Sequence, residues 1–176
     1  TTNLDSISPT WTVMQTAAQI GTGIGGTLSS IGRIVSSIEA SGRYSVLVGR
    51  DVTFEAYVGT TINNGSSWSW AQTRNVSIVS GSIDYAEHSG GLTIYAPTEN
   101  TADSVVVMCK STNGGSSWSA TSTGYSGLVM DCLCPYGGNG DDNIVYVVIR
   151  ATDRIIKTTN VGTTWSDITP SGFDID

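Results

Sequence analysis

Short runs of apolar and β-branched residues, separated by Gly, Ser, Thr and Asn, recur along the chain from about residue 34 onwards. Runs of this length between turn-forming residues are typical of β-strands, and the 3.6-residue apolar stripe of a helical repeat is absent. The runs fall into three sets of four. The predicted strands are 34–40, 44–49, 53–61 and 67–72 in the first set, 82–86, 92–96, 104–111 and 117–121 in the second, and 128–134, 144–150, 154–159 and 164–169 in the third.

An eight-residue motif lies between the third and fourth strands of each set. It reads Ser/Thr-x-Asn-x-Gly-x-Ser/Thr-Trp in all three copies, and successive tryptophans are 50 and 47 residues apart. We expect the Asn side chain to accept backbone N–H groups within a tight turn and the Gly to supply the positive φ that the turn requires. A period near 50 with four strands per repeat is typical of β-propeller blades. The motif residues are Asn63, Gly65, Trp68, Asn113, Gly115, Trp118, Asn160, Gly162 and Trp165.

The motif resembles the Asp-box, or BNR repeat, of sialidases, sortilin-type receptors, xyloglucan-cleaving glycosidases and photosynthetic assembly factors, with Asn in place of the usual Asp. The resemblance covers most of the chain. It implies an all-β fold, a partial β-propeller of about three four-stranded blades, with Asp-box turns between strands C and D of each blade. It also implies a structural role for the boxes, which in that family lie opposite the usual ligand site.

The repeat divides the chain into five parts. We assign blades to residues 34–79, 80–125 and 126–170, the start of a further strand A to 171–176, and a strand D of a preceding blade plus a Gly-rich linker to 1–33. Three blades cannot close a ring, for which four is the usual minimum. Uncovered blade faces are an aggregation liability. We therefore expect other copies of this chain, or a companion chain, to complete the propeller.

Ligands of related propellers bind on the face that carries the D-to-A and B-to-C loops. There, Asp51 with Asp103 or Asp153 would be weak candidates for the proton donor and the base of a glycosidase. Solvated loop carboxylates are the alternative, since surface Asp is common in polar loops. By this resemblance the ligand-binding face consists of Arg50, Asp51, Glu99, Asp103, Asp153 and Arg154.

A second set of carboxylates recurs with the blade period, early in each strand A. Glu39, Asp84, Asp131 and Asp176 are 45, 47 and 45 residues apart. They predict an acidic ring near the axis, which could hold a cation or sugar hydroxyls at the channel mouth, because clustered carboxylates favour hard cations. The alternative is that each carboxylate accepts hydrogen bonds from the backbone of the neighbouring blade.

Charge and composition exclude several classes of function. Eight basic residues against fifteen acidic ones give a net charge of −7, which disfavours nucleic-acid binding. No apolar run is long enough to insert into a membrane. Cys109, Cys132 and Cys134 form no metal-binding pattern, so neither a metal nor a cofactor is expected. One disulfide and a free thiol, or three buried hydrophobic residues, are the open alternatives.

The sequence therefore favours a non-catalytic propeller segment that recognises a glycan or a protein, or a structural component of an extracellular, cell-surface or virion-surface assembly. The alternative is a fragment of a glycoside hydrolase of xyloglucanase or sialidase type. Sialidase chemistry would need an Arg-Ile-Pro element, and residues 32–35, which contain Arg33, come near it without the Pro. An enzyme would place two carboxylates across one cleft.

Overall fold

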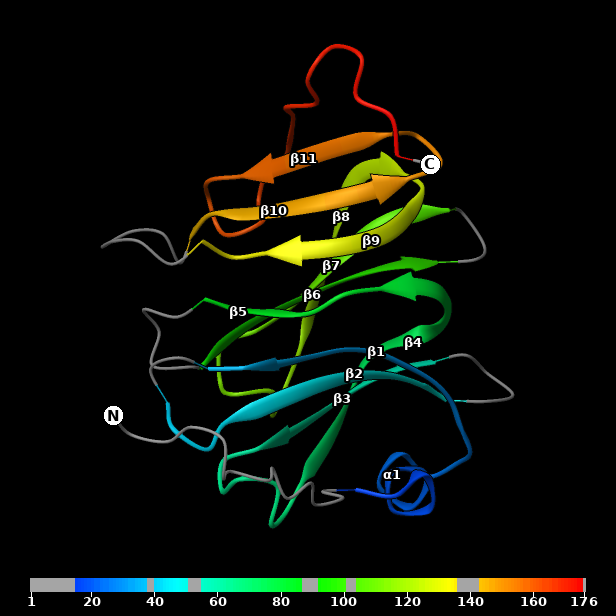
Figure 1. The fold of residues 1–176 in the computed structure, drawn as a ribbon, viewed down its shortest axis with the longest axis vertical. Coiled ribbons are helices and arrows are strands. Elements are labelled where there is room, and N and C mark those ends of the chain that lie inside the picture. Colours follow the sequence, from blue (N-terminus) through cyan, green and yellow to red (C-terminus); the bar gives the residue numbers. More distant parts are fainter. Residues whose placement is uncertain are drawn as a thin grey trace, which may run out of the picture.

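We describe a computed structural model of the chain over residues 15–37, 40–50, 55–86, 92–100, 104–135 and 143–175. This part of the protein is nearly all β, with one short helix and strands that form three four-stranded antiparallel sheets (Figure 1). The sheets follow one another along the long axis of the molecule. The chain is therefore a partial β-propeller of about three blades, as the repeat predicts.

Each blade is built from strands that are consecutive in the chain. The first blade contains β1 (Leu28–Ser36), β2 (Tyr44–Arg50), β3 (Glu55–Thr61) and the start of β4 (Ser69–Gly81). The second blade contains the end of β4, β5 (Asp84–Ala86), β6 (Thr93–Asn100), β7 (Val105–Ser111) and β8 (Ser119–Ser126). The third blade contains β9 (Leu128–Leu133), β10 (Val145–Arg150), β11 (Arg154–Thr158) and β12 (Ser166–Asp167).

Strand β4 belongs to two blades, where the sequence predicted a strand and then a linker over 73–79. Its first half pairs with β3, with Trp70 opposite Gly59, and its second half pairs with β6, with Gly81 opposite Thr98. The β-branched residues of the expected linker suit an extended backbone. The innermost strand of the second blade consists of the end of β4 and of β5, and the amide of Ser82 between them donates to Pro97 O at 3.1 Å.

The N-terminal region differs from the predicted strand D and linker over 1–33. Helix α1 (Ala17–Ile24) occupies part of it, and β1 begins at Leu28 instead of at residue 34. The helix has a capping box, in which Thr16 Oγ1 accepts from the amide of Gln19 at 3.2 Å and Gln19 Oε1 accepts from the amide of Thr16 at 2.8 Å. These caps and the burial of Ile20 outweigh the low helix propensity of glycine. The strand D expected near residue 11 lies outside the described residues.

The core consists of layers between successive sheets. One cluster joins the facing sides of the first and second blades and contains Cys109, and another joins the second and third blades and contains Cys132 and Cys134. None of the three cysteines forms a disulfide and all three are buried, so they pack as small hydrophobic residues.

Helix α1 covers the remaining face of the first blade. Its Ile20 and Ile24 are buried in a third cluster with residues of β2, and Trp70 packs against that cluster. The Trp70 ring lies between two glycines: a Cβ on Gly23 of the helix would lie 2.2 Å from Trp70 Cδ1, and one on Gly59 of β3 would lie 2.5 Å from Cζ3. Only glycine therefore allows the helix and the strand to approach this ring so closely.

We predict that Gly23→Ala destabilises the protein. Alanine stabilises a free helix by about 1 kcal/mol relative to glycine. Here the new methyl group overlaps Trp70, and overpacking of this kind costs about 1–3 kcal/mol. Denaturant unfolding would measure the change. Thr22→Ala, at an exposed position of the same helix, is the control and should change stability by less than about 0.5 kcal/mol. A more stable Gly23→Ala protein would contradict the docking of α1 on Trp70.

Candidate functional site

The three box turns share one pattern of hydrogen bonds. In the third box, Asn160 Oδ1 accepts from the amide of Thr164 at 2.9 Å and from the hydroxyl of Thr158 at 3.0 Å, and Asn160 Nδ2 donates to Thr164 Oγ1 at 2.8 Å. The amide of Gly162, whose φ is 84°, donates to Thr158 Oγ1 at 3.0 Å. The other two boxes make the same bonds. Asn suits this turn because a hydroxyl accepts from its NH₂ group, which Asp lacks.

The box tryptophans and glycines connect each turn to its surroundings. Trp118 Nε1 donates to Gly115 O at 3.1 Å, and Trp165 Nε1 donates to Gly162 O at 3.2 Å. Trp68 differs, because its buried Nε1 has no acceptor among the described residues and its ring stacks on Trp70 with centroids 6.0 Å apart. The Asn side chains and Gly amides of the boxes thus bond within the turns, which gives these residues a structural role.

The predicted ligand-binding face contains residues that hold the chain together. Arg154 Nη1 lies 2.6 Å from Asp167 Oδ2, and its guanidinium lies 5.6 Å from the centroid of the Tyr125 ring. Asp153 Oδ1 accepts from the amide of Ile175 at 3.2 Å. Glu99 is only 5% exposed. Asp51, Asp103 and the side chain of Arg50 lie outside what the structure describes. The structure therefore brings no two of these carboxylates together among the described residues.

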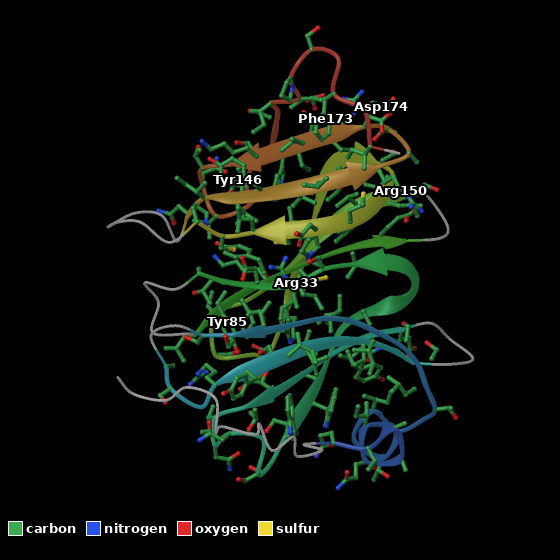
Figure 2. All side chains as sticks on the ribbon, viewed as in Figure 1. Arg33, Tyr85, Tyr146, Arg150, Phe173 and Asp174 are labelled. Atoms are coloured by element: carbon green, nitrogen blue, oxygen red, sulfur yellow. The ribbon has the colours of Figure 1, made fainter. Side chains whose placement is uncertain are left out.

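The innermost strands of the three blades meet at a polar cluster. Arg33 of β1 forms an ion pair with Asp131 of β9 and donates to Cys132 O at 3.0 Å (Figure 2 labels Arg33). The hydroxyl of Ser82, next to β5, donates to Asp131 Oδ1 at 3.2 Å. The side chains of Arg33 and Asp131 are 38% and 53% exposed, so water screens the pair. One residue from each blade contributes to this contact.

The other carboxylates of the predicted acidic ring are placed as follows. Asp84 Oδ2 accepts from the amide of Cys134 in the next blade at 2.8 Å, and Asp84 Oδ1 accepts from the amide of Tyr85 at 3.0 Å. Glu39 and Asp176 lie outside the described residues. Asp84 thus makes the inter-blade backbone bond that was the alternative to a cation site. In the sequence, Arg33 belongs only to an incomplete Arg-Ile-Pro element, and nothing in the repeat pairs it with Asp131, 98 positions away.

Among the described residues, Asp167 and Lys110 have clearly shifted pKa values. The pKa of Asp167 is lowered, mainly by the hydrogen bond from the Thr169 hydroxyl. The hydrogen bond from the Thr169 amide and the nearby charge of Arg154 lower it further. Burial lowers the pKa of Lys110, whose ammonium lies 5.7 Å from the centroid of the Tyr95 ring. Neither shift is that of a carboxylic acid kept protonated near neutral pH.

The described surface has two depressions worth noting. One, of about 510 Å³, follows α1 and the turn after it, and is lined mainly by small residues. No carboxylate lines either depression. The other, of about 310 Å³, lies between the outer strands of the second blade and the third box turn, and is lined by Met108, Lys110, Ser119, Thr121, Val161, Gly162 and Thr163.

The described residues form neither a metal-binding cluster nor a membrane-spanning helix. No group of three or more His, Cys, Asp or Glu side chains there is arranged to hold a metal ion. None of the described helical residues forms a helix long and apolar enough to cross a membrane.

The fold defines a class of protein, the β-propellers, and comparison with solved structures identifies members of that class. The chain is similar to the Niastella koreensis GH74 enzyme NkGH74, with a TM-score of 0.62 and 14% identity over 80% of this chain and 22% of that one. It is also similar to YCF48 from Cyanidioschyzon merolae, with a TM-score of 0.50 and 20% identity over 78% of this chain and 36% of that one. No protein-family model and no curated protein sequence matches. The likeness is one of fold.

We predict that Asn160→Ala destabilises the protein by about 1–3 kcal/mol, because it leaves the amide of Thr164 without its acceptor. Asn160→Asp is the matched control. It keeps the Oδ1 acceptor, and the Thr164 hydroxyl can reverse its direction and donate to the new oxygen, so a loss below about 1 kcal/mol is expected. Thermal unfolding of both variants measures the difference, and equal losses would contradict this account of the turn.

A second prediction concerns Asp167 and pH. Thr169→Val removes the main cause of the lowered pKa, so the pKa of Asp167 should rise toward its ordinary value, with NMR titration of the carboxyl carbon as the measurement. A lowered folded-state pKa contributes stability above the unfolded-state value of about 3.9, and that stability is lost as the pH falls through the folded-state value. The variant should therefore lose less stability on acidification below about pH 4. Thr169→Ser should behave like the original protein, and an unchanged pKa in Thr169→Val would assign the shift to the amide of residue 169 and to Arg154.

Proposed function

We propose that this chain is a non-catalytic β-propeller segment that recognises a glycan or a protein, or is a structural component of an extracellular, cell-surface or virion-surface assembly. The observation that carries the proposal is that the candidate polar side chains already form hydrogen bonds or ion pairs within the chain. Asp84 and Asp131 bond to neighbouring blades, Asp153 accepts a backbone amide, and Arg154 holds Asp167. Side chains that fasten blades and turns together in this way are not positioned to transfer protons to a substrate.

Asp167 lacks the electrostatics of a glycosidase acid. Hydrolysis of a glycosidic bond needs a carboxylic acid of raised pKa that faces a second carboxylate at about 5–10 Å. Asp167 has its pKa shifted in the opposite direction and is held by Arg154. The described part of the chain therefore favours binding over bond cleavage.

The groove beside the third box turn is the surface that suits recognition best. Ser119, Thr121, Thr163 and Lys110 line it. Hydroxyl and ammonium groups can bond to sugar hydroxyls or to peptide carbonyls. Val161 lines the groove with a φ of 65°, the conformation that Asn64 and Gly114 have at the same position of the other two box turns.

The alternative function is that of a glycoside hydrolase fragment, of xyloglucanase or sialidase type, and a GH74 enzyme is among the proteins that share the fold. Under this alternative, Asp51 and Asp103 remain as carboxylate candidates outside the described residues. The chain spans 22% of NkGH74, so a complete active site would draw on other blades.

Hydrolysis assays separate the two functions. We expect the protein to release no reducing sugar from xyloglucan and no sialic acid from sialyllactose above the level of the triple variant Asp51→Asn, Asp103→Asn, Asp153→Asn. Binding of the same saccharides, followed by calorimetry, should weaken in Lys110→Ala if the groove is used and should not change in the triple variant. Hydrolysis that disappears in the triple variant would overturn the non-catalytic proposal and establish the alternative.

A further inference from the structure

The groove beside the third box turn lies in the crevice between the second and third blades. Met108 and Lys110 of β7 lie opposite Thr121 and Ser119 of β8, so these four side chains share one face of the second blade. The buried Met108 belongs to the core that joins the two blades, and Val161 of the third box turn packs against that core. The groove is thus part of a blade-to-blade contact, with polar side chains beside an apolar lining.

The equivalent crevice between the first and second blades is packed more tightly. Thr60 takes the position of Lys110 there, directly before the first residue of a box. Thr60 is 7% exposed and its hydroxyl is hydrogen-bonded within the first blade. A Cβ on Gly115 of the second box would lie only 2.5 Å from Thr60 Oγ1. In the third box, a Cβ on Gly162 would lie 3.7 Å from Met108 Cγ, an ordinary contact distance. The second crevice therefore has room beside its box turn that the first lacks.

Lys110 brings a positive charge to this groove, and no carboxylate of the described residues neutralises it. None of them forms an ion pair with Lys110, and none lines the groove. The ammonium lies over the buried Tyr95 ring, 5.7 Å from its centroid. Partial burial lowers the pKa of Lys110, because an ammonium that has lost part of its water is less stable in its charged form. An anionic group bound in the groove would offset this loss of water.

Two hydroxyl groups of the groove are available to a ligand only as hydrogen-bond acceptors. The Ser119 hydroxyl donates to Lys110 O at 3.3 Å, and the Thr163 hydroxyl donates to Asn160 O at 2.8 Å. A hydroxyl group has a single hydrogen, so these two oxygens keep lone pairs but have no proton left to donate. A ligand that satisfies the whole groove must therefore carry an anionic oxygen for Lys110 and donor groups close beside it.

From these observations we propose that the groove binds an acidic sugar, with the sugar carboxylate paired to Lys110 and neighbouring sugar hydroxyls donating to Ser119 and Thr163. The inference rests on the proposed glycan recognition and adds the class of ligand. A hexuronate carries hydroxyl donors on ring carbons close to its carboxylate, and the C–H groups of its ring suit the apolar lining of Met108 and Val161.

The same criteria favour a sugar over an acidic peptide. The side chain of an aspartate or glutamate has only methylene groups beside its carboxylate, so it would meet the charge of Lys110 but would offer no donor to the two acceptor hydroxyls. The groove volume of about 310 Å³ is at the lower end of the range for ligand pockets, which suits a ligand of a few sugar units at most.

The test compares methyl β-glucuronide with methyl β-glucoside, which differ only in having a carboxylate or a hydroxymethyl group on the ring. Each is titrated into the full chain up to about 20 mM, a range that covers millimolar dissociation constants, and binding is followed by the NMR shifts of backbone amides. We expect the glucuronide to shift the amides of Lys110, Thr121, Gly162 and Thr163. It should bind at least about tenfold more tightly than the glucoside, because hydrogen bonds between charged groups are the stronger ones.

Three variants assign the preference to the groove. Lys110→Met keeps an apolar side chain without the charge and should bring the two sugars to equal affinity, whereas Lys110→Arg should keep the preference for the glucuronide. Lys157→Met is the matched control, because Lys157 has the same position in the third blade, 5.2 Å from the centroid of the Tyr146 ring, and does not line the groove. It should bind both sugars as the original protein does.

Folding is checked by the circular dichroism of each variant, and salt supplies a readout without mutation. Raising sodium chloride from about 50 to 500 mM should weaken binding of the glucuronide and leave that of the glucoside unchanged, since salt screens the charge pair. Equal affinities in the original protein overturn the inference, and so does a preference that survives Lys110→Met. Tighter binding of the peptide acetyl-Gly-Glu-Gly-amide than of the glucuronide overturns it in favour of an acidic protein partner. Hydrolysis of xyloglucan or sialyllactose would overturn the non-catalytic function alone, so the two proposals fail separately.

Discussion

A four-stranded sheet with two apolar faces is unstable in water unless both faces are covered, and this requirement organises the molecule. Each blade has one layer of apolar side chains on each side, and the chain stacks the sheets so that one blade covers the next. Apolar burial contributes about 25 cal/mol per Å² of surface removed from water, far more than the exposed ion pair between Arg33 and Asp131. The polar contacts between blades therefore set the alignment of sheets that apolar packing holds together.

The repeat could be predicted from the sequence because the box turn is a local structure. The hydroxyl, Asn and Gly of each box contact one another within a few residues, so their spacing in the chain fixes their spacing in space. Four strands between successive boxes then follow from the apolar runs. The helix α1 could not be recognised in this way. Its glycines suggest a linker, and the reason for Gly23 becomes visible only when Trp70, far along the chain, lies against it.

The candidate site shows the same limit. The periodic carboxylates Asp84 and Asp131 could be found by counting, but a count does not reveal their partners. Asp84 meets an amide of the next blade and Asp131 meets an arginine from two blades away, so two equivalent positions have different chemistry. Likewise, Glu99 is buried and Asp153 accepts an amide, although both were predicted to belong to one ligand-binding face. Long-range contacts decide these roles, and they depend on how the sheets stack.

The departures from the repeat are concentrated at the two ends of the stack, and they have one physical cause. In the first box, Trp68 leaves its indole N–H without the acceptor that Trp118 has, and stacks on Trp70 beside α1 instead. At the opposite end, the Tyr146 and Lys157 pair keeps the arrangement of Tyr95 and Lys110 without a sheet above it. The first blade is thus altered to accept a helix, while the third retains the surface of an internal blade.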